Sequence, residues 1–150
     1  MSNIAVREAR REDCPRILEL VKELALFEKA PEQVTVTLEE MEECGFGDRP
    51  VWGSLVAEVD NEIVGIALYY DRYSTWKGRR LYLEDLIVTE SKRGSGIGKL
   101  LLDELIVFAK ENKYNGVVWQ VLDWNEPAIN FYKKYNAEFD PEWINVSVNF

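Results

Sequence analysis

A glycine-rich stretch between two apolar segments is the strongest chemical signal in this chain. Glycine lets the backbone approach an anion closely, and a helix that begins after such a stretch offers unpaired N–H groups and a partial positive charge. The stretch therefore predicts a phosphate site, although the same residues could form only a helix-capping turn. Its members are Arg93, Gly94, Ser95, Gly96, Ile97, Gly98 and Lys99.

Two common phosphate motifs do not fit these residues. A P-loop would need glycine at Arg93 and a hydroxyl residue at Leu100. A dinucleotide fingerprint would need its third glycine at Lys99, and it would open the fold rather than follow a late strand. The stretch therefore matches neither motif, and the two interpretations that remain are a phosphate site of another kind and a helix-capping turn.

Acid–base chemistry in this chain must use groups other than histidine, because the chain contains none. Glu84 and Asp85 are adjacent in a predicted strand, where successive side chains point to opposite faces. Both can serve one site only if the strand bulges. The alternative is that the pair forms ion pairs with Arg79 or Arg80.

Tyr132 is the candidate proton donor. It lies on a predicted helix that begins near Pro127 and shares a face with Ala128, four residues earlier. A phenol with a pKa near 10 can donate a proton to a basic leaving group. Without other signals, a tyrosine in this position would be read as a core residue.

The spacing of apolar residues predicts the elements that must position these groups. The order of strands and helices describes an α+β fold whose mixed, mostly antiparallel sheet has helices on both faces. In the first half we predict a strand at 4–8, a helix capped by Asp13 with Pro15 in its first turn, a helix from Thr37 to about Gly45, strands at 52–59 and 62–70 joined by the turn Asp60–Asn61, and a linker at 71–78. In the second half we predict a strand at 81–88, a helix from Ile97 to Lys110, a strand at 116–122, a helix ending near Tyr135, and a strand at 144–150.

Composition limits the class of protein. With 150 residues, 47% of them hydrophobic, the chain is expected to be a single globular domain, residues 1–150. A net charge of −9 favours cationic partners and disfavours nucleic acid. We expect a cytoplasmic protein without a membrane span, because no apolar run has the required length. Cys14 and Cys44 have no ligand spacing, so we expect free thiols and no metal site.

The glycine-rich stretch resembles the pyrophosphate loop of the GNAT acyl-CoA-dependent N-acetyltransferases, whose pattern is Arg-x-x-Gly-x-Gly. Further segments resemble the diamine acetyltransferase branch of that family, and together they span almost the whole chain. They are Phe27-Glu28-Lys29, residues 45–48, 73–79 and 82–85, and the run from Val121 to Tyr132.

The resemblance implies the GNAT fold, acetyl-CoA as cosubstrate, a homodimer, and transfer of the acetyl group to a primary amine of a small cationic substrate. The transfer would be a direct attack in a ternary complex, without a metal. Tyr132 would be the general acid, and Glu84 would take up the amine's proton through water on a bulged strand. The backbone of Leu86, Ile87 and Val88 would pair with the pantetheine arm, the loop from Arg93 would hold the pyrophosphate, and Asn125 would contact CoA. The expected substrate-binding residues are Trp76, Glu84, Asp85, Glu28 and Trp143.

This sequence differs from the diamine acetyltransferase branch at positions that affect the choice of substrate. The polyamine enzymes have an acidic residue where this chain has Ser74, two places before Trp76. Without that carboxylate, a thialysine- or lysine-like amino acid or a short diamine is favoured over a long polyamine. Glu142 and Trp143 are adjacent here, whereas the polyamine enzyme separates them by one residue. The alternatives are a protein or peptide N-acetyltransferase and a non-catalytic acyl-CoA sensor.

Overall fold

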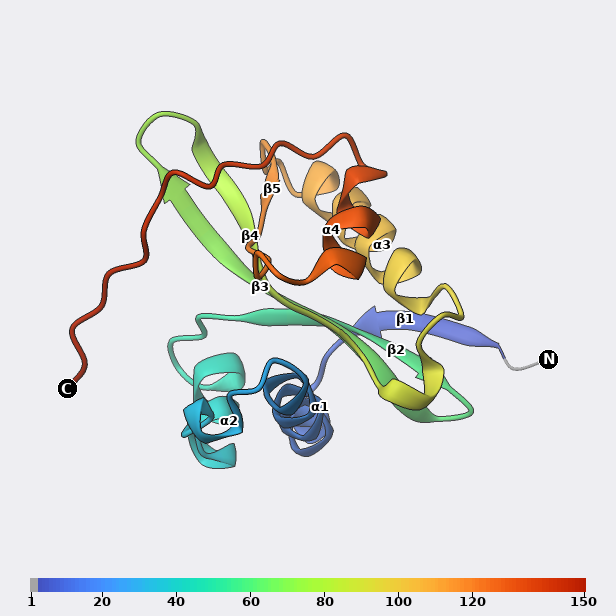
Figure 1. Cartoon of the computed structure of the whole chain (residues 1–150). Coiled ribbons are helices and arrows are strands. Elements are labelled where there is room, and N and C mark those ends of the chain that lie inside the picture. The colour runs from blue at the N-terminus through green and yellow to red at the C-terminus, as the bar shows by residue number, and fades with distance from the viewer. Residues whose placement is uncertain (1–2) are drawn as a thin grey trace. The chain divides into compact units, whose positions relative to one another are not determined.

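A five-stranded sheet with helices packed on it forms the larger of two compact parts of the chain (Figure 1). The computed structural model describes residues 3–150; the larger part ends at Trp119, and Gln120–Phe150 form the smaller one. In chain order the elements of the larger part are β1 (Ile4–Glu8), α1 (Cys14–Phe27), α2 (Leu38–Phe46), β2 (Gly53–Val59), β3 (Glu62–Ser74), β4 (Gly78–Val88), α3 (Ile97–Glu111) and β5 (Val117–Val118). The smaller part contains α4 (Glu126–Lys133).

The strands lie in the order β1-β2-β3-β4-β5. The first three pairings are antiparallel and the pairing of β4 with β5 is parallel. This confirms the predicted α+β class with a mixed, mostly antiparallel sheet. None of the helices formed by residues 3–150 is both long and apolar enough to cross a membrane.

Helices cover both faces of the sheet, as predicted (Figure 1). On one face, Ile17 of α1 and Met41 of α2 join Ile66 and Ile87 of the sheet in one buried cluster. On the other face, the ring of Phe108 in α3 lies 5.1 Å from the ring of Tyr69 in β3, measured between centroids. The apolar stripes of the helices, spaced three and four residues apart, therefore pack on the sheet.

The prediction of a linker at 71–78 is wrong, because these residues extend β3 and form the turn into β4. The pairing continues from Asp71 opposite Leu81 to Ser74 opposite Gly78. The hydroxyl oxygen of Ser74 accepts hydrogen bonds from the N–H groups of Trp76 and Lys77, at 3.2 and 3.0 Å. Polar cross-strand contacts stabilise this exposed arm, which hydropathy alone does not reveal.

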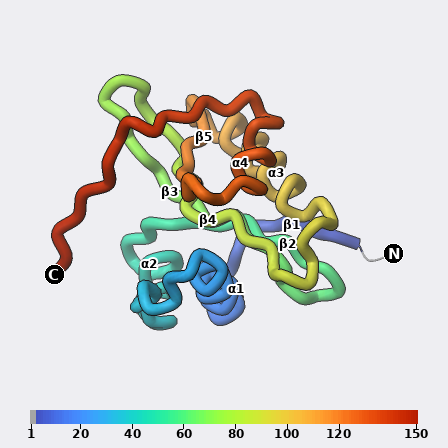
Figure 2. Tube along the Cα trace, viewed as in Figure 1, coloured from blue at the N-terminus to red at the C-terminus, as the bar shows by residue number. Residues whose placement is uncertain are grey.

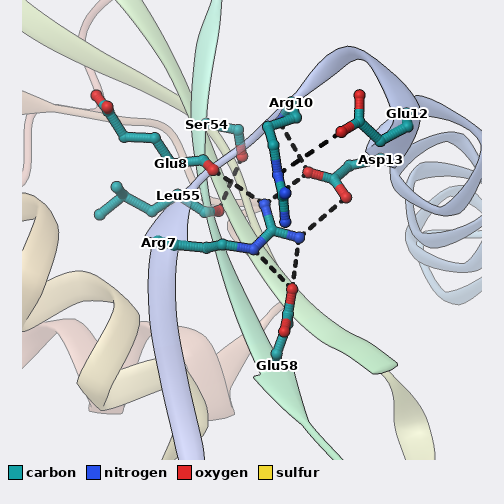
Figure 3. A network of polar contacts seen from close by, with 8 residues as sticks. All are labelled: Arg7, Glu8, Arg10, Glu12, Asp13, Ser54, Leu55 and Glu58. Atoms are coloured by element: carbon teal, nitrogen blue, oxygen red, sulfur yellow. Dashed lines mark hydrogen bonds and ion pairs between the residues drawn. The ribbon is translucent and has the colours of Figure 1, made fainter. Parts of the chain in front are cut away.

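Asp13 is the N-cap residue of α1 and Pro15 lies in its first turn, as predicted, but the carboxylate of Asp13 accepts no hydrogen bond from that turn (Figure 3). Instead it accepts hydrogen bonds from the guanidinium of Arg7 at 2.8 and 3.0 Å and from the N–H group of Arg10 at 2.7 Å. Arg7 also donates to Glu58 at 2.6 Å. These contacts connect β1, β2 and the start of α1 through groups that are largely removed from water.

Three predicted extents near the C-terminus differ from the structure. The strand expected at 116–122 contains only the two residues of β5, and α4 ends at Lys133, before Tyr135. The strand expected at 144–150 does not form. Its apolar residues alternate along the sequence, but a strand also needs a hydrogen-bonded neighbour, and this segment has none in the described sheet.

Candidate functional site

The glycine-rich stretch connects β4 to α3, and Figure 2 traces this connection. A short 3₁₀ turn at Glu90–Lys92 leads into it. Gly94 and Gly96 have φ angles of 79° and 87°, a left-handed conformation that glycine adopts without the steric cost of a Cβ atom. A Cβ atom at either position would meet no heavy atom within 4 Å, so this side of the loop has room for a ligand.

The N-terminus of α3 follows directly and adds donors to this open side. The N–H group of Leu100 donates to the carbonyl of Gly96 at 3.0 Å. The N–H groups of residues 97–99 therefore precede the first hydrogen bond of the helix and point out of its end. Together with the helix dipole they favour a bound anion. The ammonium of Lys99 forms an ion pair with Asp103 at 2.6 Å on the exposed surface.

A carboxylate on α1, which sequence analysis missed, holds the start of the loop. Glu23 accepts hydrogen bonds from the N–H group of Glu90 at 2.7 Å and from the hydroxyl of Thr89 at 3.1 Å. One of its oxygens also lies 3.8 Å from a guanidinium nitrogen of Arg93. The bonded residues are 66 and 67 positions away in the sequence, so no local pattern could indicate the contact.

The side chain of Arg93 is engaged with protein groups. Its Nε donates to the carbonyl of Val88 at 3.0 Å, and its Cζ lies 5.3 Å from the centroid of the Phe27 ring. Such a cation–π contact contributes modestly at an exposed site. The side chain thus ties the loop to the end of β4 and to α1, while the glycine backbone and the end of α3 supply the N–H groups that could hold phosphate.

One edge of β4 has no strand beside it where the pantetheine arm is expected. Leu86, Ile87 and Val88 pair with β3 on one side. On the other side, β5 pairs with β4 only at Leu81 and Tyr82. In the sheet formed by the described residues, no strand covers the backbone groups of β4 beyond Tyr82 on this side. Apart from the carbonyl of Val88, which accepts from Arg93, they can pair with an extended ligand, as in strand addition by a peptide.

A β-bulge in β4 falls at the predicted carboxylate pair. Leu68 lies opposite Asp85 and Tyr69 lies opposite Leu83, with a register shift between the two pairs. Glu84 has no partner in the ladder and is the extra residue of the bulge. The distortion that the sequence required for a shared site is present.

The bulge places both carboxylates on the face covered by α1 and α2. Asp85 lies opposite Leu68, which belongs to the core beneath these helices. Glu84 accepts a hydrogen bond from the hydroxyl of Tyr70 at 2.8 Å, and Tyr70 is on the same face as Leu68 because a single residue separates the two in the strand. An undistorted strand would direct one of the carboxylates to the opposite face.

Asp85 faces a small, mostly apolar cavity of about 210 Å³ between the sheet, α1 and α2. Burial, and then the charges of Glu84 and Glu28, raise the pKa of Asp85 to about 7. Burial also raises the pKa of Glu28. A cation at this position would relieve the unfavourable burial and repulsion of these carboxylates. The residues that line the cavity are Val21, Val36, Glu40, Met41, Cys44, Trp52, Leu68 and Asp85.

Two tyrosines, also missed by sequence analysis, lie next to the carboxylates. The rings of Tyr70 and Tyr82 stack with centroids 5.2 Å apart. Burial and the hydrogen bond to Glu84 raise the pKa of Tyr70, so its hydroxyl stays protonated and remains a donor to Glu84. The Cζ of Arg72 lies 5.5 Å from the centroid of the Tyr82 ring.

Trp76 is not brought to this cluster within one chain. It lies in the turn after Ser74, with 89% of its surface exposed. Five residues of strand separate Tyr69, beside the bulge, from Ser74, which corresponds to about 17 Å at 3.4 Å per residue. An aromatic role for Trp76 at the carboxylates is therefore not supported by the arrangement of β3 and β4.

The remaining predicted site residues belong to the smaller part. Tyr132, on α4, is 9% exposed, and its ring lies 5.5 Å from that of Phe131. The side-chain oxygen of Asn125 accepts from the N–H group of Ala128 at 3.3 Å and caps α4. Trp143 is 78% exposed and donates from Nε1 to Asp140 at 2.8 Å.

Comparisons with known proteins agree on one family. Residues 15–137 match the Acetyltransferase (GNAT) family. The chain is 39% identical to a thialysine N-epsilon-acetyltransferase of Bos taurus over 146 residues, covering 92% of this chain and 86% of that protein. It is 38% identical to a spermidine/spermine N(1)-acetyltransferase-like protein 1 of Homo sapiens, over 91% of this chain and 21% of that protein.

Solved structures share the fold at low sequence identity. An aminoglycoside acetyltransferase from an uncultured soil metagenomic sample superposes with a TM-score of 0.79. The alignment covers 98% of this chain and 96% of that one, with 18% identity. At this identity the likeness concerns the fold alone.

Proposed function

This chain belongs to the GNAT acetyltransferase family, and we propose that the acceptor of the acetyl group is the primary amine of a small cation. A thialysine- or lysine-like amino acid fits best, with diamines and polyamines as the wider class. The names of the relatives that act on thialysine, and of an Arabidopsis thaliana relative that acts on L-ornithine, support this choice. Family members use acetyl-CoA as the acetyl donor.

The pair of carboxylates on one face of the sheet is the observation that carries the proposal. Glu84 and Asp85 face the same side because of the bulge in β4, and the charge of Glu28 adds to theirs at Asp85. Asp85 lines a small cavity, and the charges of Glu84 and Glu28 act on it, so this group of carboxylates favours a cationic ligand. An uncharged or anionic acceptor would gain nothing from them.

The chain offers groups that fit the expected acetyl donor. The open backbone of Gly94 and Gly96 and the first N–H groups of α3 suit a pyrophosphate. The unpaired edge of β4 near Leu86–Val88 suits the amide-containing pantetheine arm. Bound there, acetyl-CoA would supply a thioester as the activated acyl group, and we propose that no metal takes part.

Proton transfer on the acceptor side is assigned to Glu84. An alkyl ammonium has a pKa near 10 and must lose a proton before its nitrogen can attack a carbonyl carbon. Glu84 takes this proton through a water molecule, while Asp85 lies beside the same ammonium and helps to hold it before the proton leaves. The amine nitrogen then forms the new C–N bond by direct attack in a ternary complex.

Tyr132 is assigned as the proton donor to the leaving group. When the C–S bond breaks, the sulfur carries the electron pair and needs a proton, which the phenol of Tyr132 donates. The phenolate regains a proton from solvent. We also propose that Asn125 contacts CoA and that Trp143 contributes to the acceptor site, as the family resemblance implies.

A homodimer is part of the proposal. Four apolar side chains that alternate in the C-terminal segment are exposed by 81% or more, namely Ile144, Val146, Val148 and Phe150. Exposed apolar groups in this number favour a protein partner, and a second copy would supply one. Sedimentation of the purified chain tests this, and a monomer at micromolar concentration would contradict it. The cytoplasmic location remains a prediction from the sequence.

The test is acetyl-CoA-dependent thiol release over a panel of amines, namely thialysine, lysine, ornithine, putrescine, spermidine and a lysine-containing peptide. The wild type is compared with Tyr132→Phe, and Tyr135→Phe is the matched control on the neighbouring tyrosine. We expect turnover of a free amine that falls at least about 100-fold in Tyr132→Phe, the contribution typical of general acid catalysis. Turnover of the peptide alone would favour a protein acetyltransferase, and binding of acetyl-CoA without turnover would favour a sensor.

A further inference from the structure

Arg72 is a charged side chain next to the site, and the proposed chemistry does not use it. It is exposed on β3, two residues beyond Tyr70, and so faces the same side as Tyr70. Its guanidinium lies against the ring of Tyr82 at 5.5 Å. Within residues 3–150 it forms no ion pair, although Glu84 is a neighbour on the same face.

The register of the strands explains why Arg72 and Glu84 do not pair. The facing residues Tyr70 and Tyr82 lie between Arg72 and the bulge, and Tyr70 already donates to Glu84. Three residues of strand separate Arg72 from Tyr69, beside the bulge, which corresponds to about 10 Å between the two backbone positions. A cationic group and a pair of anionic groups are thus held apart on one face of the sheet, across two stacked rings.

The arginine opposite Arg72 does not share this position. Arg80 faces Arg72 across the strands, but its Nη1 donates to the side-chain oxygen of Asn115 at 3.4 Å. Its guanidinium also lies close to Gly116, where a Cβ atom would be 2.7 Å from Cζ. The guanidinium of Arg80 is therefore engaged with the segment that precedes β5, whereas that of Arg72 lies beside the stacked tyrosines.

We propose that Arg72 binds the carboxylate of an α-amino acid whose side-chain ammonium lies at Glu84 and Asp85. This inference rests on the proposed function of the same site and names a residue that selects the substrate. A guanidinium forms two parallel hydrogen bonds with a carboxylate, and no carboxylate within residues 3–150 forms an ion pair with Arg72 that would compete. The charge pattern of the face, negative at the bulge and positive at Arg72, matches the two ends of a lysine-like amino acid.

The same arrangement disfavours a diamine. Lysine and a diamine of the same length both carry an ammonium at this end, which the guanidinium repels, but only lysine also has a carboxylate there to pair with Arg72. Hydrogen bonds to charged groups contribute about 1.5 kcal/mol or more, which is roughly tenfold in affinity. Arg72 therefore separates amino acids from their decarboxylated counterparts.

The experiment compares kcat/KM for lysine and for cadaverine, the diamine left when lysine loses its carboxylate, in the wild type and in Arg72→Gln. We expect the wild type to prefer lysine by roughly tenfold or more. In Arg72→Gln the KM for lysine should rise by about that factor with kcat within about twofold, while cadaverine is unchanged or improved. Arg80→Gln is the matched control, because it removes the same charge from the facing residue, and it should change neither amine by more than about twofold.

Three results would overturn the assignment of Arg72 while leaving amine acetylation intact. They are an equal loss of kcat/KM for both amines in Arg72→Gln, no loss for either amine, and the same loss in Arg80→Gln. If the wild type acetylates neither amine, the proposed function fails, and calorimetric binding of the two amines to the complex with CoA decides the role of Arg72. Tighter binding of lysine that Arg72→Gln abolishes would support the subsite. Equal binding of lysine and cadaverine would refute it.

Discussion

Glu23 offers a sharp test of how the phosphate loop is held. Its carboxylate is not expected to touch either substrate, yet it binds the N–H group of Glu90, the hydroxyl of Thr89 and the edge of the Arg93 guanidinium. We predict that Glu23→Gln weakens acetyl-CoA binding by loosening the loop, without slowing the chemical step.

The magnitude follows from the number and type of these contacts. Hydrogen bonds to a charged group contribute about 1.5–3 kcal/mol and neutral ones about 0.5–1.5 kcal/mol. Glutamine keeps the shape and one acceptor oxygen but loses the charge, and the Glu23 side chain is 29% exposed, so water replaces part of what is lost. We therefore expect the ordered loop to be destabilised by about 1–2 kcal/mol, a factor of roughly 5–30.

The assay is steady-state kinetics with acetyl-CoA varied at saturating amine. KM for acetyl-CoA should rise about 5–30-fold while kcat stays within about twofold. Glu19→Gln is the matched control, since Glu19 lies one turn earlier on α1, is 66% exposed, and pairs only with Arg16 at 3.7 Å. It should leave both constants unchanged.

Two results would refute this reasoning. An unchanged KM for acetyl-CoA in Glu23→Gln would show that the loop keeps its shape without the carboxylate. A fall in kcat with KM unchanged would place Glu23 in the chemistry instead. A loss of global stability is excluded by comparing the thermal unfolding of both variants with that of the wild type.

Three further predictions concern stability and the loop. Gly96→Ala forces a left-handed φ on a residue with a Cβ atom, so urea denaturation should show a loss of about 1–2 kcal/mol, with a higher KM for acetyl-CoA; an unchanged midpoint would contradict it. Folding raises the pKa of Asp85 from 3.8 to about 7, so between these pH values the folded state keeps a proton that the unfolded chain has lost, and the stability of the fold falls as pH rises from 3.8 to 7. Asp85→Asn removes this titration and should therefore raise Tm more at pH 8 than at pH 5. An equal gain in Tm at both pH values would contradict the prediction. The guanidinium of Arg7 lowers the pKa of Asp13, so the pair stabilises the fold above pH 3.8, and this stabilisation is lost as pH falls through the pKa of Asp13 in the folded state. Asp13→Asn should lower the free energy of unfolding by about 2–4 kcal/mol at pH 7 and by less at pH 3. Chemical denaturation at the two pH values measures both changes.

The loop could be predicted from the sequence because its geometry depends on residues close together in the chain. Gly94 and Gly96 adopt positive φ angles for a reason contained in the residue itself. The helix that follows is indicated by apolar residues three and four apart, and α3 begins where predicted, at Ile97. The family assignment and the fold class, which rest on such local patterns, are confirmed.

The arrangement of the acceptor site depends on contacts between segments far apart. The residues Glu84 and Asp85 indicate that a shared site needs a bulge, but its location is fixed by the pairing of Leu68 and Tyr69 in the neighbouring strand. The bond from Tyr70 to Glu84 likewise arises only once β3 and β4 pair. The sequence thus predicts which chemical groups form the site but not which residues they contact.

Strand extents were the least predictable feature for the same physical reason. Alternating apolar residues from Ile144 to Phe150 predict a strand, but the segment has no hydrogen-bonded neighbour in the described sheet. Residues 71–74, which have little apolar character, do form a strand, because β4 lies beside them and Arg79 forms an ion pair with Asp71 at 2.7 Å. A strand requires a partner as well as a pattern.

The most direct test of the central claim is the product stoichiometry of the wild type and Glu84→Gln with acetyl-CoA and lysine, measured by thiol titration and mass spectrometry. Amine acetylation at the bulged carboxylates predicts one acetylated lysine for each free thiol in the wild type, and a rate at least about 100-fold lower in Glu84→Gln. Thiol release without acetylated lysine, or full activity in Glu84→Gln, would contradict it.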